Sequence, residues 1–350
     1  MVVSRDEMAS RPLTMWRYRE WLPLVGPPAV ALPVRCTPLF RADGLAKQLG
    51  VKNLWLKDEG KNPSGSFKDR LVALSLNKAR ELGISTVICA STGNLGRSVI
   101  ALAPSLKITA HVLVPESLAA SKTIAVRGTY DEANRLAIQV AEARGWAVLN
   151  VTLHPFYAEG GKTIGHEIAE QMGRLPRHIV CCMAGGSLIG KIYQGIREFV
   201  AADLVADSPV SMYGAQPAGC APIVAAFKDG IEEPIPIRNP ETRVHALSVG
   251  DPGDGYFALR LLRQTGGTAE NVTDREAAWG LEMLARTEGI RTELASGVTV
   301  AAAKKLIDSG ILPRDEEIVL VLTGRVNTTP VTGQPLAVID PTREAFDRLL

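Results

Sequence analysis

The sequence predicts an α/β fold with two domains and mostly parallel sheets flanked by helices. Short apolar runs of strand length alternate along the chain with segments of helical periodicity, which is the pattern typical of parallel strands joined by helices. With 350 residues, 46% of them hydrophobic, the chain is long enough for a sizeable core and for two domains. The runs expected to form strands are residues 54–56, 86–88, 108–114, 147–151, 179–180 and 318–322.

Two segments between these runs have a clear helical pattern, residues 131–144 and 275–288. Asp131 and the pair Thr273-Asp274 are expected to be their N-caps, because short polar side chains accept hydrogen bonds from the free backbone N–H groups of a first turn. Residues 231–256 are rich in Pro and Gly and show no clear period. We expect this stretch to form ordered loops near a ligand cleft.

Composition excludes several classes of function. The net charge is only +2, which gives no electrostatic reason to expect binding to nucleic acid or to a membrane surface. The longest apolar stretches have strand length and are too short to span a bilayer. The five cysteines include no C-x-x-C pair and no disulfide framework, so we expect no metal site and a reducing, cytoplasmic compartment. The polar N-terminus predicts no signal peptide.

Lys68 is the candidate reactive side chain. It lies in the segment NPSGSFKDR at residues 62–70, just after a Gly/Ser turn and at the start of a helical pattern. The positive end of a helix dipole disfavours protonation of an amine placed there. A neutral lysine attacks carbonyl groups and forms a Schiff base. Taken alone, the pattern also fits a surface lysine that follows a turn.

Three further segments each place small or polar residues directly after an apolar run. CASTGNLG at residues 89–96 reads as the end of a strand, a polar turn and a helix start, where free N–H groups suit a carboxylate or a phosphate. MAGGSLIG at residues 183–190 has the small residues that let backbone N–H groups surround a phosphate, although it matches neither common phosphate-loop pattern. The strand at residues 318–322 ends in Thr323-Gly324. Each segment alone also fits an ordinary βα turn.

Taken together and in this order, these segments resemble the tryptophan-synthase-β-like (fold type II) enzymes that use pyridoxal phosphate, and within them the threonine synthases. The resemblance runs from about Trp16 to about Gly324. The supporting segments are MWRYRE at 15–20, CTPL at 36–39, LKDEG at 56–60, GAQ at 214–216, VTD at 272–274 and EGI at 288–290. The resemblance is specific for fold and cofactor and much less specific for substrate.

The resemblance implies a role for each candidate residue. Lys68 would form the Schiff base with pyridoxal phosphate and later move protons on the substrate. Asn94 would donate a hydrogen bond to the phenolic oxygen of the cofactor, and Thr323 would face its pyridine nitrogen. The remaining implied ligands are Gly185, Gly186, Ser187 and Leu188 for the cofactor phosphate, and Ser91, Thr92 and Gly93 for the substrate carboxylate.

Thr323 also bears on the type of reaction. A neutral hydroxyl does not strongly favour a protonated pyridine ring, so the ring becomes a weaker electron sink than one that faces an aspartate. This environment suits elimination and replacement at a β or γ carbon better than transamination. Thr323 is alternatively a cap at the end of its strand.

A domain division is expected near residue 160. The N-terminal domain, 1–160, would carry Lys68 and the substrate-carboxylate loop, and its residues 1–40 would pack across the other domain. The C-terminal domain, 161–350, would carry the phosphate loop and Thr323. A ligand held between two domains is a common arrangement, and closure would keep water from reaction intermediates.

The substrate-facing part of the resemblance is altered. The segment typical of threonine synthases is N-S-x-N-P-x-R-x-E-G-Q-K-T, whereas residues 151–163 read VTLHPFYAEGGKT. His154 and Tyr157 replace an Asn and an Arg that the family associates with the phosphate of O-phosphohomoserine, and Lys162 remains. Loss of the Arg removes a bidentate, permanently charged anion ligand. Arg35 and Arg325 are additional cations, either ligands of a different acid group or ordinary loop residues.

These observations predict a pyridoxal-phosphate-dependent lyase, similar to threonine synthase, that performs β- or γ-elimination and replacement on a divergent activated amino acid. A genuine threonine synthase and a serine/threonine dehydratase are the alternatives. A non-catalytic binding protein with this fold is disfavoured because Lys68, Asn94 and Thr323 are all present. The expected partner is a small amino acid, and a homodimer is usual for the fold.

Overall fold

The computed structural model describes residues 3–91, 93–150, 153–326 and 333–350. It divides into two compact units. The first unit contains Met1–Arg11, Cys36–Lys61 and Lys162–Val326, and the second contains Pro12–Arg35, Asn62–Gly161 and Asn327–Leu350. The chain does change units next to residue 160. It also changes at four other places, so these units differ from the contiguous halves 1–160 and 161–350.

A six-stranded sheet forms the centre of the first unit. Its strand order is β1-β2-β10-β7-β8-β9, in which β1 runs antiparallel to β2 and the other neighbours are parallel. The apolar strand β10 pairs with β2 on one side and with β7 on the other, which explains why Cys36–Lys61 belongs to this unit. The strands are β1 (Leu39–Arg41), β2 (Asn53–Asp58), β7 (His178–Cys182), β8 (Ser211–Pro217), β9 (Thr268–Val272) and β10 (Glu317–Leu322).

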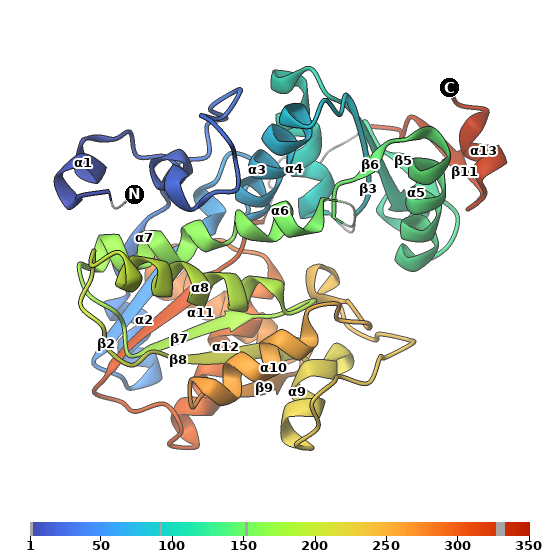
Figure 1. Cartoon of the computed structure of the whole chain (residues 1–350). Helices are drawn as coiled ribbons and strands as arrows, with labels where there is room; N and C mark the ends of the chain where they lie inside the picture. Colours follow the sequence, from blue (N-terminus) through green and yellow to red (C-terminus); the bar gives the residue numbers. More distant parts are fainter. Residues whose placement is uncertain (1–2, 92, 151–152, 327–332) are drawn as a thin grey trace. The chain divides into compact units, whose positions relative to one another are not determined.

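Helices cover both faces of this sheet, and Figure 1 shows α8 in front of it and α12 behind it. Ile318–Leu322 of β10 are fully buried, as expected for a central parallel strand with helices on both faces. Alternate residues such as Ile318 and Leu320 pack in one cluster with Leu284 and Leu306 of the α11–α12 pair. The helices of this unit are α1 (Arg5–Ser10), α2 (Asp43–Leu49), α7 (Lys162–Met172), α8 (Ser187–Ala201), α9 (Pro222–Lys228), α10 (Gly255–Gln264), α11 (Asp274–Glu288) and α12 (Leu294–Asp308).

Two glycines allow α7 and α8 to lie unusually close together. A Cβ atom built on Gly195 of α8 would lie 2.1 Å from the carbonyl oxygen of Lys162, and one built on Gly165 of α7 would lie 2.0 Å from that of Ile192. Both contacts are with backbone atoms, so a side chain cannot be accommodated by a rotamer change. The crossing of these helices therefore requires glycine on each of them.

Replacing Gly195 with alanine should lower the free energy of unfolding by about 2 kcal/mol or more, because the helices must move apart and lose packing. Gly190 of the same helix is the matched control. Among the described residues, no atom lies within 4 Å of a Cβ built there. Gly190→Ala should leave stability unchanged or raise it by about 1 kcal/mol through helix propensity. Chemical unfolding followed by circular dichroism measures the free energy of unfolding of both variants. Equal effects of Gly195→Ala and Gly190→Ala would contradict the close crossing of α7 and α8.

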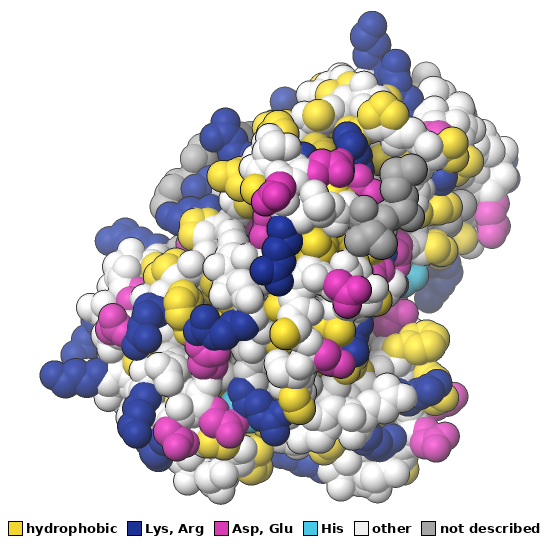
Figure 2. All heavy atoms as spheres, turned by 60° about the vertical axis from the view of Figure 1, so that its left-hand side comes forward, with side chains coloured by type: hydrophobic (Ala, Val, Ile, Leu, Met, Phe, Trp, Pro, Cys, Tyr) yellow, Lys and Arg dark blue, Asp and Glu magenta, His cyan; other side chains and the backbone are white. Residues whose placement is uncertain are grey.

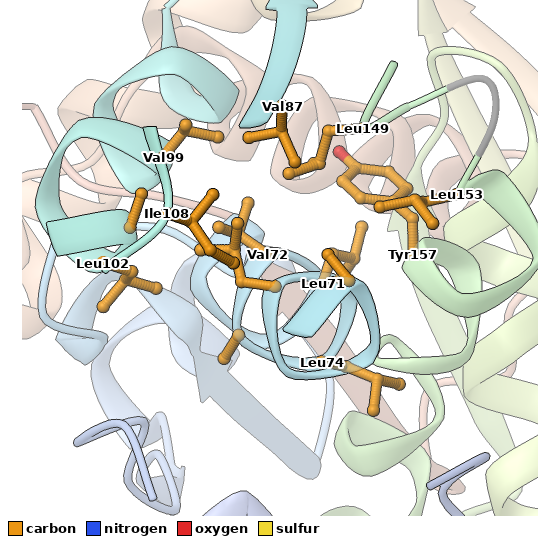
Figure 3. Packing of buried hydrophobic residues seen from close by; sticks show 14 of the residues in the cluster. Leu71, Val72, Leu74, Val87, Val99, Leu102, Ile108, Leu149, Leu153 and Tyr157 are labelled. Atoms are coloured by element: carbon orange, nitrogen blue, oxygen red, sulfur yellow. The ribbon is translucent and has the colours of Figure 1, made fainter. Parts of the chain in front are cut away.

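A five-stranded, fully parallel sheet forms the centre of the second unit, in the order β11-β5-β4-β3-β6. One side of it packs on α3 and α4, as shown for Val72, Val87 and Val99 in Figure 3, and the other packs on α5 and α13. The elements are β3 (Thr86–Ala90), β4 (Thr109–Pro115), β5 (Ile124–Val126), β6 (Ala147–Val148), β11 (Ala337–Ile339), α3 (Lys68–Glu81), α4 (Asn94–Leu102), α5 (Tyr130–Arg144), α6 (His154–Glu159) and α13 (Arg343–Asp347).

The N-terminal segment is divided between the units. Trp16 and Val34 are buried in the same cluster as Leu71 and Leu74 of α3, so residues 12–35 contribute to the core of the second unit. Short 3-10 helices complete the chain: η1 (Met15–Trp21), η2 (Glu59–Lys61), η3 (Ala103–Leu106), η4 (Glu116–Leu118), η5 (Ala218–Cys220) and η6 (His245–Leu247).

One predicted helix cap is confirmed and the other is wrong. Thr273 caps α11 in a reciprocal capping box with Glu276. In α5 the N-cap is Thr129, whose hydroxyl accepts from the N–H of Glu132, whereas Asp131 lies inside the first turn. Thr129 takes the cap because the carboxylate of Glu132, three residues later, accepts a hydrogen bond from the Thr129 backbone N–H at 2.7 Å. Asp131 still favours the helix start electrostatically.

The surface carries mixed charge. On the face seen in Figure 2, Lys and Arg side chains are interspersed with Asp and Glu, and neither sign forms a continuous patch. In the part of the chain that the structure describes, no helix is long and apolar enough to cross a membrane.

Candidate functional site

Lys68 is the first residue of α3, directly after the turn at residues 62–65. Gly65 permits that turn because its φ of 91° lies in the left-handed region. The next residue, Asp69, accepts hydrogen bonds from the backbone N–H of Ser64 at 2.6 Å and from the hydroxyl of Ser98 in α4 at 2.5 Å. Asp69 thereby fixes the turn before Lys68 and joins the start of α3 to the middle of α4. Sequence reasoning missed this role, although an acidic residue in a first helical turn is a recognisable signal.

The amine of Lys68 lies beside Tyr157 of α6. Lys68 Nζ donates a hydrogen bond to the Tyr157 hydroxyl at 2.8 Å and lies 4.7 Å from the centre of the Phe67 ring. Burial raises the pKa of Tyr157 well above its usual range, and nearby Cys89 acts in the same direction. Tyr157 is therefore a neutral hydroxyl at physiological pH.

The loop after β3 leads into α4. The hydroxyl of buried Ser91 accepts hydrogen bonds from the N–H groups of Gly93 at 3.0 Å and Gly96 at 2.8 Å, which closes the turn. Gly93 has a φ of 145°, and Asn94 is the first, half-buried residue of α4. Thr92 lies outside the described residues. The loop thus places Asn94 at the carboxyl end of a parallel strand, where ligands bind in open α/β sheets.

The glycine-rich loop connects β7 to α8 in the first unit. Gly186 is the N-cap of α8 with a φ of 95°, and a Cβ there would lie 2.8 Å from the carbonyl oxygen of Asp254. Among the described residues, no atom lies within 4 Å of a Cβ built on Gly185. Ser187 and Leu188 are the first two residues of the helix, so their N–H groups have no partner within the helix ladder. Free N–H groups at a helix start, next to an uncrowded glycine, fit a phosphate group.

Asp254 was not among the predicted site residues, yet its backbone N–H donates to the carbonyl oxygen of Gly185 at 2.9 Å. Residues 231–256 were expected to form loops near a ligand cleft. The contact of Asp254 with the glycine-rich loop agrees with that expectation. Apart from η6, this stretch has no regular element before α10 begins at Gly255.

Thr323 directly follows β10, which pairs with β7 in the same sheet. It is 2% exposed, and its hydroxyl oxygen lies 3.6 Å from the sulfur of Cys182 at the end of β7. The glycine-rich loop and Thr323 therefore lie at the carboxyl ends of two neighbouring strands, β7 and β10. A hydroxyl can donate or accept a hydrogen bond, so Thr323 fits a neutral pyridine nitrogen.

The remaining predicted substrate residues are Lys162, His154 and Tyr157. Lys162 Nζ is paired with Glu198 at 2.8 Å, and the same carboxylate lies 2.7 Å from His166 Nε2. Lys162 belongs to the first unit, whereas His154 and Tyr157 belong to the second, with their ring centres 6.4 Å apart. Arg35 and Arg325 are exposed, and each lies in an isolated β-bridge, with Thr14 and Thr292 respectively.

Comparison with known proteins agrees with this arrangement. Residues 30–324 match the family described as pyridoxal-phosphate dependent enzyme. The chain is 37% identical to a threonine synthase of Methanosarcina acetivorans, over 98% of this chain and 89% of the relative. It is 38% identical to a threonine synthase of Methanocaldococcus jannaschii, over 92% of this chain and 82% of the relative.

Solved structures share the fold at lower identity. Threonine deaminase isoform 2 from Solanum lycopersicum superposes with a TM-score of 0.70 at 22% identity, over 83% of this chain and 84% of that one. Maize serine racemase superposes with a TM-score of 0.71 at 20% identity, over 84% and 89%. The predicted α/β fold type II architecture and its cofactor are thus confirmed. The chain belongs to the pyridoxal-phosphate dependent enzyme family and is a member similar to the threonine synthases.

Proposed function

We propose that this protein catalyses elimination and replacement at the β or γ carbon of an activated amino acid. The observation that carries the proposal is Thr323, a buried neutral hydroxyl at the end of the central strand β10, beside the strand that leads into the glycine-rich loop. Bound pyridoxal phosphate supplies an electron sink for carbanion chemistry. A neutral hydroxyl facing its ring nitrogen suits elimination and replacement better than transamination.

The proposal assigns a role to each candidate residue. Lys68 holds the cofactor covalently and moves protons on the substrate, and Asn94 donates to the phenolic oxygen. The N–H groups of Gly185, Gly186, Ser187 and Leu188 hold the phosphate. The loop of Ser91, Thr92 and Gly93 binds the substrate carboxylate. The hydroxyl of Ser91 already accepts two backbone N–H groups, so we assign carboxylate binding chiefly to the N–H groups of this loop.

We further propose that the substrate differs from O-phosphohomoserine. The position where the resemblance expects an Arg holds the neutral, buried Tyr157, and Lys162 is already paired with Glu198. A phosphate dianion would lack a permanently charged ligand at these two positions. His154 is the remaining candidate among the three, and it would bind an anion only when protonated.

One other activity has specific support. The curated relatives named above are threonine synthases, which favours the conversion of O-phosphohomoserine and water to threonine and phosphate as the second candidate. A serine/threonine dehydratase is a third candidate. A cytoplasmic homodimer in an amino-acid biosynthetic pathway completes the proposal, supported by the cysteine pattern and by what is usual for the fold.

The test is the visible absorbance spectrum of the purified protein before and after addition of O-phosphohomoserine. A cofactor band that stays unchanged, with no phosphate released, supports a divergent substrate. A band that shifts with release of phosphate and formation of threonine would overturn that part of the proposal and identify a threonine synthase. Absence of a cofactor band after incubation with pyridoxal phosphate would contradict the enzymatic proposal as a whole.

A further inference from the structure

The hydrogen bond between Lys68 and Tyr157 joins two elements of the second unit that are far apart in sequence. Lys68 begins α3, and Tyr157 lies in the middle of α6. The 2.8 Å bond runs from Nζ to the phenol oxygen, and Nζ also lies 5.2 Å from the centre of the Tyr157 ring. The amine that the proposed chemistry requires is therefore held by a tyrosine.

Tyr157 itself and two nearby groups, Cys89 and Tyr130, are uncharged near neutral pH. Tyr157 stays a phenol because burial raises its pKa, and burial also raises the pKa of neighbouring Cys89 to about 12. Tyr130, which interacts electrostatically with Tyr157, has its pKa raised to about 12, again chiefly by burial. Lys68 thus faces a neutral acceptor on this side. Such an acceptor favours the ammonium form through a hydrogen bond without neutralising its charge.

Backbone packing fixes the position of the phenol. A Cβ atom built on Gly160, just after α6, would lie 2.5 Å from the carbonyl oxygen of Arg70 in α3. Glycine at this position lets α6 approach the first turn of α3, the turn that carries Lys68. In Figure 3 the Tyr157 ring lies beside Leu153 at the edge of the apolar cluster. The phenol oxygen is therefore held next to Nζ by the packing of α6 on α3.

We propose that Tyr157 is a positioning residue for Lys68: its neutral phenol fixes the amine at the start of α3 and favours the protonated form that acts as a general acid. This inference rests on the proposed function for the catalytic role of Lys68. It gives Tyr157 a function other than contact with the substrate. The geometry of the Lys68 amine then depends on α6 as well as on α3.

The first test measures the reactivity of Lys68 in the full-length, cofactor-free protein. Trace acetylation with acetic anhydride at pH 7.5 is followed by mass spectrometry, with Lys78 of the same helix as internal reference. Loss of a hydrogen bond that favours the ammonium form should raise the free-amine fraction, so Lys68 should be acetylated about 3- to 10-fold faster in Tyr157→Phe. Tyr213→Phe is the matched control, since Tyr213 is a buried tyrosine of the first unit whose hydroxyl lies 3.2 Å from His178 Nδ1. It should leave the Lys68 rate unchanged.

The second test uses the cofactor-loaded enzyme with whichever amino acid it turns over. Tyr157→Phe should lower kcat about 10-fold or more and change KM less than twofold, because proton movement is impaired and substrate binding is not. A folded Tyr157→Phe protein whose Lys68 acetylation stays within twofold of wild type would overturn the proposal. If that variant does not fold, Tyr157→Met, which also lacks the hydroxyl, is used for the same labelling.

The two proposals fail in different ways. The labelling measurement needs neither cofactor nor substrate, so it can support the role of Tyr157 even if no activated amino acid is turned over. Conversely, turnover that depends on Lys68, with unchanged labelling in Tyr157→Phe, would retain the proposed function and reject the positioning role.

Discussion

Replacing Lys68 with alanine should abolish covalent attachment of the cofactor and lower turnover by at least about 10²- to 10⁴-fold, the usual effect of losing a positioned acid/base group. The loss has two causes, because in the proposed function the same amine holds the cofactor and moves the protons. Borohydride reduction followed by mass spectrometry of the peptides reports the attachment directly. In the wild-type protein the cofactor should remain on the peptide that contains Lys68.

The control for this experiment is Lys78→Ala, which removes an amine from the same helix. Lys78 pairs with Glu81 at 2.5 Å and lies 5.0 Å from the centre of the Phe156 ring, so its known contacts are structural. Cofactor attachment and turnover should stay close to those of the wild type. A Lys68→Ala protein that still carries reducible cofactor on another lysine would show that the reactive amine has been misassigned.

Removing the positive charge of Lys57 should have the largest effect on stability. Lys57 of β2 and Glu167 of α7 form a fully buried ion pair at 2.6 Å, and Lys57 Nζ also donates to the carbonyl oxygen of Thr37 at 2.8 Å. The Thr37 hydroxyl bonds to Glu59, a second buried carboxylate. Lys57→Met leaves buried negative charge without its lysine, so we expect a loss of about 3–5 kcal/mol in the free energy of unfolding.

A surface pair provides the comparison. Arg286 and Glu282 of α11 are paired at 3.4 Å with side chains 66% and 61% exposed, so Arg286→Met should cost less than about 1 kcal/mol. The double variant Lys57→Met/Glu167→Leu should recover part of the lost stability, because it also removes one of the buried carboxylates that have lost their lysine. Unfolding in urea gives a midpoint for each of the three variants, and the midpoints are compared with that of the wild type. A Lys57→Met midpoint equal to that of Arg286→Met would contradict the assigned cost of the buried charge.

The sequence determined those elements whose residue pattern can be recognised within the element itself. β10 and β7 were predicted because a parallel strand covered on both faces is a continuous apolar run. The starts of α3 and α4 were predicted because small and polar residues after an apolar run indicate a turn that leads into a helix. The same locality singled out Lys68, Asn94, the glycine-rich loop and Thr323 as candidate residues.

Only the tertiary structure showed those elements whose residues fit a strand through contacts with distant parts of the chain. β8, with the sequence SMYGAQP, was not among the expected strands because it contains Gly214 and Gln216. A Cβ on Gly214 would lie 2.3 Å from the Met183 side chain, and the side-chain oxygen Oε1 of Gln216 accepts from the N–H of Ile223 at 2.9 Å. Both residues fit a buried strand because of neighbours that the local pattern does not show.

The same distinction applies to the candidate site. The pattern around residue 157 showed that an expected cation was missing, but not that Tyr157 would contact Lys68, 89 positions away. The sequence around Lys162 likewise gave no indication that Lys162 pairs with Glu198. Sequence determined which residues can perform the chemistry, because residue type and local turn set that capacity. Tertiary structure decided which of them hold one another, because charge and hydrogen-bond partners come from segments distant in the chain.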